Sequence, residues 1–406
     1  MKWNLLILAL LTVGHLYRIV LNVIQYRSAN NPTPANVADV YDAETYQRWK
    51  HYNGEKCRLG IFSVAVSYVL MLVLLCTGAH AAFASLFPAN AYLQLIAVLL
   101  LQTVLEAVVN FGLNYVSTMV IEEKYGFNRS TMKTFILDRI RSLIIELVIS
   151  IGLVCILAAL HLALGNWMIL LFTVVFFCIT LLITFLYPIF SRIGNKFVPL
   201  EEGELKDRLM GLLSKHGYQV KAIEVMDASR RTTKLNAYFT GFGKMKTIVL
   251  YDNLVNAMST DEICSVFAHE LGHGLHKDVL KQQTMNVGNM LLMSVVAWLA
   301  VSEPMLHTAF GFEQVNYGFA YLLLNIGLGL VQPLTGMLMN AYSRMAEYRA
   351  DRQAASEGYG EAMITALKKL AVENFSDLSP SKIIVVLEYS HPPLSARIAA
   401  LEKLEK

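Results

Sequence analysis

Long apolar runs dominate the hydrophobic pattern of this 406-residue chain. Seven windows are long enough for a helix to cross a hydrocarbon core of about 30 Å, which takes roughly 20 residues. They span residues 3–24, 59–86, 93–120, 143–164, 167–190, 288–311 and 321–342. The first window is interrupted by His15 and Arg18 and is followed by no small-residue cleavage site. It therefore predicts a retained helix and not a cleaved signal peptide.

Two polar segments, about 193–287 and 343–406, lie outside these windows. Each must join the other in one domain if either is to bury a core. Three short stretches of the first segment are typical of strands: 221–227, 234–241 and 246–252. Residues 259–280 follow with helical spacing, and a capping box of Ser259 and Glu262 begins that helix. We predict a mostly α domain with a small β-sheet, assembled from two pieces of chain.

Composition supports a membrane protein, since 55% of the residues are hydrophobic and 16% are charged, against roughly 45–50% and 25% in soluble domains. Lysines and arginines concentrate in four segments and are missing from the turns near 87–92, 165–166 and 312–320. The basic segments are 25–58, 121–142, 191–287 and 343–406. By the positive-inside rule these segments, including the polar domain and the carboxyl terminus, face the cytoplasm.

Charge and cysteine content exclude other classes. The net charge of +3 reflects basic residues beside membrane spans, so we expect no nucleic-acid partner. The five cysteines show no paired spacing. Neither a disulfide framework nor a sulfur-ligated metal is therefore indicated.

The stretch "VFAHELGHGLHKD", residues 266–278, carries the clearest chemical signal. On a helix, His269 and His273 are four residues apart and project from one face. H-E-x-x-H on a helix is the metalloprotease arrangement, in which two histidines bind zinc and the intervening glutamate, Glu270, takes a proton from the attacking water. The alternative is a polar helix face with satisfied histidines. His276 is too far along the helix to share the metal with both others, and we interpret it as a supporting or surface residue.

A catalytic zinc needs a third protein ligand and one open position. The last apolar window continues into "NAYSRMAEYRADRQA", residues 340–354, where Glu347 and Asp351 are four residues apart. A glutamate ligand followed one turn later by an aspartate that orients a ligating histidine is the arrangement of zincins with two histidines and a glutamate. The alternative is an acidic pair on a solvated helix end.

With these motifs the chain resembles a known family, the type 1 CAAX prenyl endopeptidases, which are integral-membrane zinc metalloproteases with seven spans. The resemblance runs over nearly the whole length and includes motifs in the family's order. Besides "HELGH" and "SRMAEYRAD", these are "IEEKYGFNRST" (121–131), "GNKFVPLEEGEL" (194–205), "NAYFTGFG" (236–243) and "HPPLSARI" (391–398).

The resemblance implies roles residue by residue. It implies one zinc ion per chain, held by His269, His273 and Glu347. Glu270 is then the general base and acid, and Asp351 holds a ligand in place.

Four further residues take roles from the same resemblance. Asn236 and Ala237 lie on an implied edge strand that holds the substrate backbone as an added strand, a mode that gives sequence-tolerant hydrogen bonds. His391 and Arg397 are implied to steady the scissile carbonyl or a substrate carboxylate, where a cation stabilises developing negative charge. For His391 the alternative is a residue at a helix start before Pro392.

Several polar residues fall inside the apolar windows, where they are costly in lipid. The family encloses a large chamber within its helices, so these residues are candidates for its lining, although hydrogen bonding between helices is the alternative. They are His15, Arg18, Asn22, Glu106, Asn110, Asn114, Glu146, Asn325 and Gln332.

The predicted architecture is an α-helical polytopic membrane protein with seven transmembrane helices and a zincin-like cytoplasmic metalloprotease domain. Residues 1–192 hold transmembrane helices 1–5, 193–287 the first part of the metalloprotease domain, 288–342 helices 6 and 7, and 343–406 the second part. The predicted location is a bacterial inner membrane, with the endoplasmic reticulum as the alternative, because no retrieval signal closes "ALEKLEK".

The predicted function is cleavage of peptide bonds near the carboxyl terminus of prenylated CAAX-type or similar membrane-associated proteins. The expected partners are a peptide or protein substrate and the lipid bilayer, and the sequence does not determine the oligomeric state. The alternatives are a membrane quality-control metalloprotease of the heat-shock type and, less favoured, a non-enzymatic channel or scaffold with a vestigial site.

Overall fold

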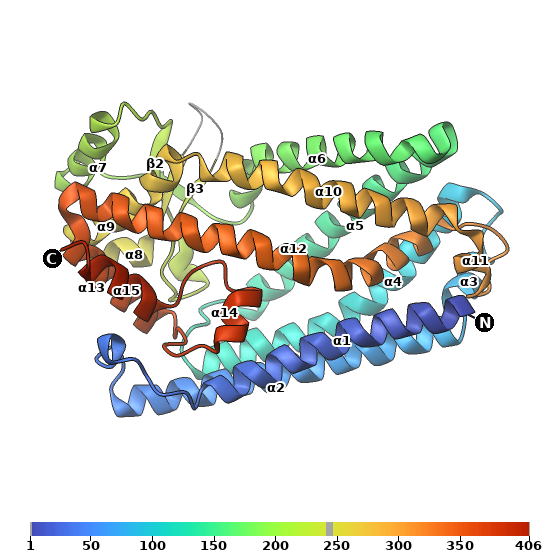
Figure 1. Cartoon of the computed structure of the whole chain (residues 1–406), viewed down its shortest axis with the longest axis horizontal. Helices are drawn as coiled ribbons and strands as arrows, with labels where there is room; N and C mark the ends of the chain where they lie inside the picture. The colour runs from blue at the N-terminus through green and yellow to red at the C-terminus, as the bar shows by residue number, and fades with distance from the viewer. Residues whose placement is uncertain (1, 241–246, 406) are drawn as a thin grey trace.

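The computed structural model describes residues 2–240 and 247–405, apart from the side chains of residues 187, 188, 239 and 240. Long helices run side by side along the longest axis of the molecule, and a smaller mixed α and β domain is at one end (Figure 1). The carboxyl terminus lies in that domain, whereas the amino terminus lies at the opposite end of the helices.

Within the described residues, nine α-helices build the long body. They are α1 (Lys2–Ser28), α2 (Ala43–Cys76), α3 (Ala79–Ala84), α4 (Ala91–Tyr115), α5 (Met132–Leu164), α6 (Met168–Ser191), α10 (Asp278–Ser302), α11 (Pro304–Thr308) and α12 (Tyr317–Ala354). The short 3-10 helix η1 (Ala35–Val37) follows α1, and η3 (Gly165–Trp167) joins α5 to α6. A π-helical segment, η2 (Val116–Glu122), continues α4.

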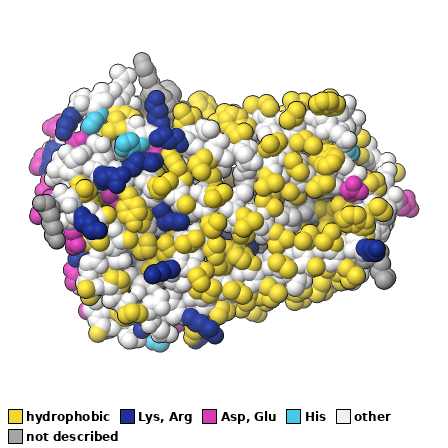
Figure 2. Space-filling model, viewed as in Figure 1, with side chains coloured by type: hydrophobic (Ala, Val, Ile, Leu, Met, Phe, Trp, Pro, Cys, Tyr) yellow, Lys and Arg dark blue, Asp and Glu magenta, His cyan; other side chains and the backbone are white. Residues whose placement is uncertain are grey.

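Six stretches of the described chain are long and apolar enough to cross a membrane. The fourth, Met132–Leu186, contains α5 and most of α6. Apolar side chains cover most of the visible face along the helices, and charged side chains gather at the end that holds the small domain (Figure 2). Exposed side chains such as Val108, Val148 and Leu334, each at least 67% exposed, fit a lipid-facing surface. The protein is therefore a multi-pass membrane protein.

Two helices extend beyond the apolar windows that predicted them. α2 begins at Ala43, capped by Asp42, which accepts a hydrogen bond from the backbone of Thr45. The first part of α2 contains charged residues, so the search for apolar windows did not find it. It is helical because its buried Trp49 packs into an apolar cluster next to the small domain. α10 begins at Asp278, ten residues before its window.

The small domain contains a four-stranded sheet of order β1-β2-β4-β3. Its strands are β1 (Phe197–Pro199), β2 (Ala222–Met226), β3 (Ala237–Thr240) and β4 (Thr247–Tyr251). β2 and β4 are parallel, and the two outer strands are antiparallel to their neighbours. Each of the three predicted strands contains an observed one, although residues 234–236 precede β3 and are not in a strand. β1 was missed. Residues 241 and 246, at the ends of two predicted strands, lie outside the described residues.

Helices complete the small domain around an apolar core. They are α7 (Glu204–Lys215), α8 (Asp252–Ala257), α9 (Thr260–Leu275), α13 (Gly360–Glu373), α14 (Lys382–Glu388) and α15 (Leu394–Glu402), with the 3-10 helix η4 (Ala228–Arg230) and the π-helical η6 (Ala355–Tyr359). The predicted capping box at the start of α9 is confirmed, because Ser259 and Glu262 exchange both hydrogen bonds. α9 packs against α12, so the two polar segments meet in one domain.

Two cavities lie among the long helices, with volumes of about 470 and 740 Å³. Arg18 lines both of them, and Tyr389 lines both the larger cavity and a cleft in the small domain. Of the polar residues predicted for a chamber, all but Asn114 line one of these cavities. The burial cost of these side chains is therefore reduced by polar neighbours and by space for water.

Candidate active site

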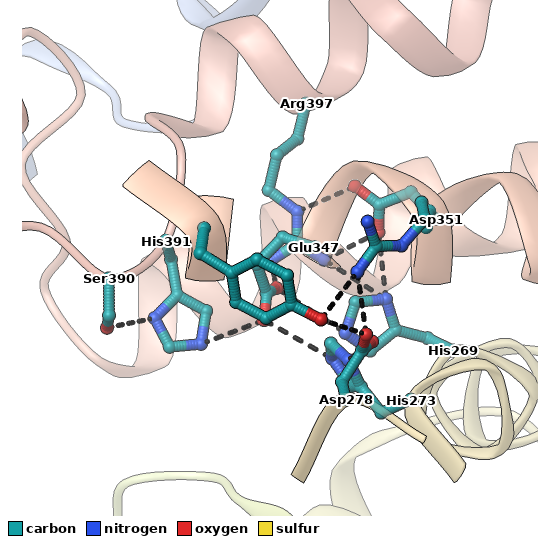
Figure 3. Close-up of polar contacts among 10 residues, drawn as sticks. His269, His273, Asp278, Glu347, Asp351, Ser390, His391 and Arg397 are labelled. Atoms are coloured by element: carbon teal, nitrogen blue, oxygen red, sulfur yellow. Dashed lines mark hydrogen bonds and ion pairs between the residues drawn. The ribbon is translucent and has the colours of Figure 1, made fainter. Parts of the chain in front are cut away.

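Two helices bring the predicted metal ligands together. α9 supplies His269 and His273 one turn apart, and α12 supplies Glu347. The two helices approach closely at Gly272, where an added Cβ atom would lie only 3.0 Å from Cα of Ala350. Within the described residues, these three form the one group of ligands whose donor atoms all lie within 4.8 Å of one another. Figure 3 shows Glu347 between the two imidazoles and the carboxyl-terminal segment.

The geometry of this group fits a divalent metal. The Nε2 atom of His269 lies 3.5 Å from Glu347 Oε2, and that of His273 lies 3.3 Å from Glu347 Oε1. Two ligands at about 2.0–2.1 Å from a tetrahedral zinc ion are about 3.3–3.4 Å apart. In addition, Glu347 Oε2 is buried and accepts no hydrogen bond from any described residue. The Arg397 Nη1 atom lies 3.3 Å from this oxygen without forming a hydrogen bond to it. A metal cation held between Glu347 and the two imidazoles would satisfy the buried oxygen.

The electrostatics of the site also favour a cation. Burial alone would lower the pKa of His269, but the hydrogen bond of its imidazole with the Asp351 carboxylate and the nearby Glu347 carboxylate raise that pKa to about 9. Burial also lowers the pKa of His273, but the Glu347 carboxylate raises it by more, so the pKa of His273 is raised as well. Positive charge is therefore stabilised where the two rings meet Glu347.

Asp351 lies where an orienting carboxylate is needed. Its Oδ1 atom is 2.9 Å from Nδ1 of His269, which leaves Nε2 directed at Glu347. Arg397 from α15 holds this carboxylate in turn, through Nε to Oδ2 at 2.8 Å and Nη2 to Oδ1 at 2.6 Å. Asp351 and Arg397 are both buried, so the charges of this pair compensate each other.

A second carboxylate, which sequence reasoning missed, lies beside the other histidine. Asp278 at the start of α10 places Oδ2 3.1 Å from Nδ1 of His273 (Figure 3). Its other oxygen accepts hydrogen bonds from Tyr342 and Arg349 of α12. The available signal was an acidic residue five positions after His273, which helical spacing alone does not bring to the same face.

Glu270 has the surroundings of a general base. It follows His269 on α9, is partly buried, and lines the cleft together with Glu347. Burial raises the pKa of its carboxyl group, although the neighbouring imidazoles act in the opposite direction. A raised carboxyl pKa suits a group that must take up a proton and then release it.

The cleft of about 500 Å³ beside the metal ligands is lined by all four of the remaining predicted site residues. Asn236 and Ala237 lie at the start of β3, the outer strand of the sheet, whose far side pairs with no described strand. His391 precedes α15, is largely exposed, and lies 3.4 Å through Nε2 from Glu347 Oε1. Its Nδ1 atom is 2.9 Å from the Ser390 hydroxyl (Figure 3).

Two predicted roles are refined by these positions. Arg397 was expected to face the substrate, but two of its donors are occupied by Asp351 and a third, Nη1, lies 3.3 Å from Glu347. His276 is the residue that caps the carboxyl end of α9, and its supporting or surface role stays a prediction.

An H-E-x-x-H helix joined by a glutamate from a membrane helix defines a membrane metalloendopeptidase. Comparison with known proteins agrees over nearly the whole chain. Residues 22–192 match the family model described as CAAX prenyl protease N-terminal, five membrane helices, and residues 199–405 match peptidase family M48. The chain belongs to the M48 metallopeptidase family, with the amino-terminal membrane domain of the CAAX prenyl proteases.

Curated relatives and a solved structure extend this result. The chain is 29% identical to a CAAX prenyl protease 1 homolog of Oryza sativa, over 98% of this chain and 96% of the relative. It is also 29% identical to CAAX prenyl protease 1 of Saccharomyces cerevisiae, over 98% and 95%. The crystal structure of S. mikatae Ste24p superposes with a TM-score of 0.92 at 27% identity, covering 99% of both chains.

Proposed function

We propose that this metalloendopeptidase uses one zinc ion to cleave peptide bonds near the carboxyl terminus of prenylated CAAX-type or similar membrane-associated substrates. The observation that carries the proposal is the convergence of His269, His273 and Glu347 on one point at the side of a cleft. The names of the relatives supply the substrate class, since both are CAAX prenyl proteases.

The cleft suits an extended peptide. The outer edge of β3 pairs with no described strand, and at its start the Ala237 N–H is held by the Asn236 side chain at 2.9 Å. A substrate strand added at this edge would take over that N–H, and such pairing depends little on sequence. A peptide bound there would pass Glu270 and the metal ligands. His391, whose side chain is 64% exposed and lines the cleft, would donate a hydrogen bond to the peptide carbonyl.

Each residue has a defined part in hydrolysis. His269, His273 and Glu347 would hold zinc, which when bound polarises the scissile carbonyl and acidifies the attacking water. Glu270 would take a proton from that water and pass it to the leaving amine. Asp351 would keep the proton of His269 on Nδ1, so that Nε2 remains a lone-pair donor.

Delivery from the membrane is consistent with the cavities. Tyr389 lines both the cleft and the larger cavity among the long helices, and Arg18 lines both membrane cavities. A lipidated or apolar segment could therefore occupy the cavities while the adjoining peptide lies in the cleft. This arrangement favours a substrate that is held in the membrane.

The finer architecture belongs to the same proposal. Division of Met132–Leu186 into α5 and α6 would give seven crossings, with a zincin-like domain formed by residues 193–287 and 343–406. The basic segments would place this domain in the cytoplasm. We retain the bacterial inner membrane as the proposed location, with the endoplasmic reticulum as the alternative.

The test is cleavage of a farnesylated CAAX peptide by the purified protein in lipid, followed by mass spectrometry of the products. We expect a cut close to the modified cysteine, and cleavage slower by about 10²- to 10⁴-fold with Glu270→Gln. Cleavage of an unfolded membrane protein at many sites, with no action on the prenylated peptide, would favour the quality-control alternative. No cleavage of either substrate by the zinc-loaded protein would contradict the proposal.

A further inference from the structure

Asp278 forms a buried hydrogen-bond network with residues from two other helices, α9 and α12. It is 3% exposed and begins α10. One oxygen is 3.1 Å from His273 Nδ1 on α9. The other accepts from the Tyr342 hydroxyl at 3.0 Å and from Arg349 Nη2 at 2.6 Å, both on α12. The carboxylate thus connects a predicted metal ligand to two long helices.

The chain must leave helical geometry to make this contact. In a continuous helix, residues five apart point about 140° away from each other. Lys277, which lies between α9 and α10, has φ +56°, a left-handed conformation that non-glycine residues seldom adopt. This break turns Asp278 back towards His273. An unfavourable backbone angle is kept where the contact that it permits is itself stabilising.

The network determines which nitrogen of His273 carries the proton. An ionised carboxylate only accepts hydrogen bonds, so Nδ1 of His273 must donate to it. Nε2 is then the lone-pair donor, and it lies 3.3 Å from Glu347 Oε1. Arg349 compensates the buried charge of Asp278 at 2.6 Å. The arrangement repeats that of Asp351 and Arg397 at the other histidine.

We propose that Asp278 is a positioning residue for the zinc ligand His273, and that through Arg349 and Tyr342 it couples zinc affinity to the packing of α10 against α12. The inference rests on the proposed zinc site. Carboxylates that support a ligating histidine typically change metal affinity by about 10- to 100-fold when removed. A carboxylate that merely joins two helices would alter stability and leave zinc affinity unchanged.

The experiment measures zinc affinity of the full chain in detergent by competition with a chromophoric chelator. Asp278→Ala should weaken zinc binding by about 10- to 100-fold, and Asp278→Asn, which keeps the shape but loses the charge, by about tenfold. The visible spectrum of the cobalt-substituted protein should also shift in Asp278→Asn. Tyr342→Phe removes one hydrogen bond and no charge, so its loss of affinity should be smaller.

A matched control is a buried carboxylate outside the site. The Glu357 side chain is 4% exposed and lies 2.7 Å from Lys215 and 2.6 Å from His216. Glu357→Gln should lower thermal stability while leaving zinc affinity and the cobalt spectrum unchanged.

Three outcomes separate the two proposals. If the wild-type chain binds no zinc, the proposed function fails. If it binds zinc and Asp278→Asn binds equally well with an unchanged cobalt spectrum, only the role of Asp278 is overturned. If Asp278→Ala does not fold, Asp278→Asn and Tyr342→Phe decide the question, because both keep the volume of the side chain.

Discussion

Removal of the Asp351 carboxylate should destabilise the protein as well as its metal site. Asp351 is 1% exposed and Arg397 is 9% exposed. Two hydrogen bonds of 2.8 and 2.6 Å join them. Asp351→Ala leaves the guanidinium buried without its main partner, a change that typically costs about 3–5 kcal/mol. Arg397 still has the Glu347 carboxylate as a partner at 3.3 Å. We therefore expect the free energy of unfolding to fall by about 3 kcal/mol, at the lower end of that range.

The assay is reversible unfolding in mixed detergent micelles after zinc has been stripped, so that stability is measured apart from metal affinity. The double variant Asp351→Ala with Arg397→Met should lose less than the sum of the single changes, because the guanidinium and the Asp351 carboxylate are then removed together and neither is left buried without the other. In a separate titration, Asp351→Ala should bind zinc about 10- to 100-fold more weakly. A zinc-free Asp351→Ala protein within about 0.5 kcal/mol of wild type would refute the assignment of a buried, charge-compensating pair.

Three further predictions concern chemistry, metal and folding. Glu270→Gln should lower the turnover number by about 10²- to 10⁴-fold with one zinc ion still bound, as measured by peptide cleavage and metal analysis. A chelator should abolish cleavage and added zinc should restore it, since the donor set of His269, His273 and Glu347 is intact without the metal. Ser259→Ala should destabilise the protein by about 1 kcal/mol, because it removes the cap of α9, and unfolding experiments would measure this loss.

Each of these predictions has an opposing result. Wild-type turnover in Glu270→Gln would remove Glu270 from the proton transfer. Cleavage that persists at metal levels below detection would exclude metal-dependent hydrolysis. An unchanged stability of Ser259→Ala would mean that packing of α9 alone determines where that helix begins.

The metal ligands were predictable because regular helices carry them. The capping box at Ser259 set the start of α9, and four-residue spacing put His269 and His273 on one face. Glu347 and Asp351 follow the same spacing on α12. Where the backbone is regular, sequence separation translates directly into direction in space.

Asp278 was missed because its position depends on an irregular backbone. The left-handed angle at Lys277 is a property of one residue in its tertiary setting, and no helical or strand period describes it. The first part of α2 was missed for a related reason. It is charged in sequence, and its helix is stabilised by packing of Trp49 against distant parts of the chain. β1 has three residues and ends in Pro199, too short a run to show alternation.

The length of α12 has a mechanical consequence. Its 38 residues extend for about 57 Å, and Glu347 lies about 45 Å from the start of the helix at Tyr317. Rotation by about 2° around that distant end would move the carboxylate by about 1.6 Å, well beyond the roughly 0.2 Å tolerance of a metal–ligand bond. Lipids of different acyl-chain length change the tilt of such helices. A change in bilayer thickness that tilts α12 at its Tyr317 end should therefore change the cleavage rate, although no ligand binds.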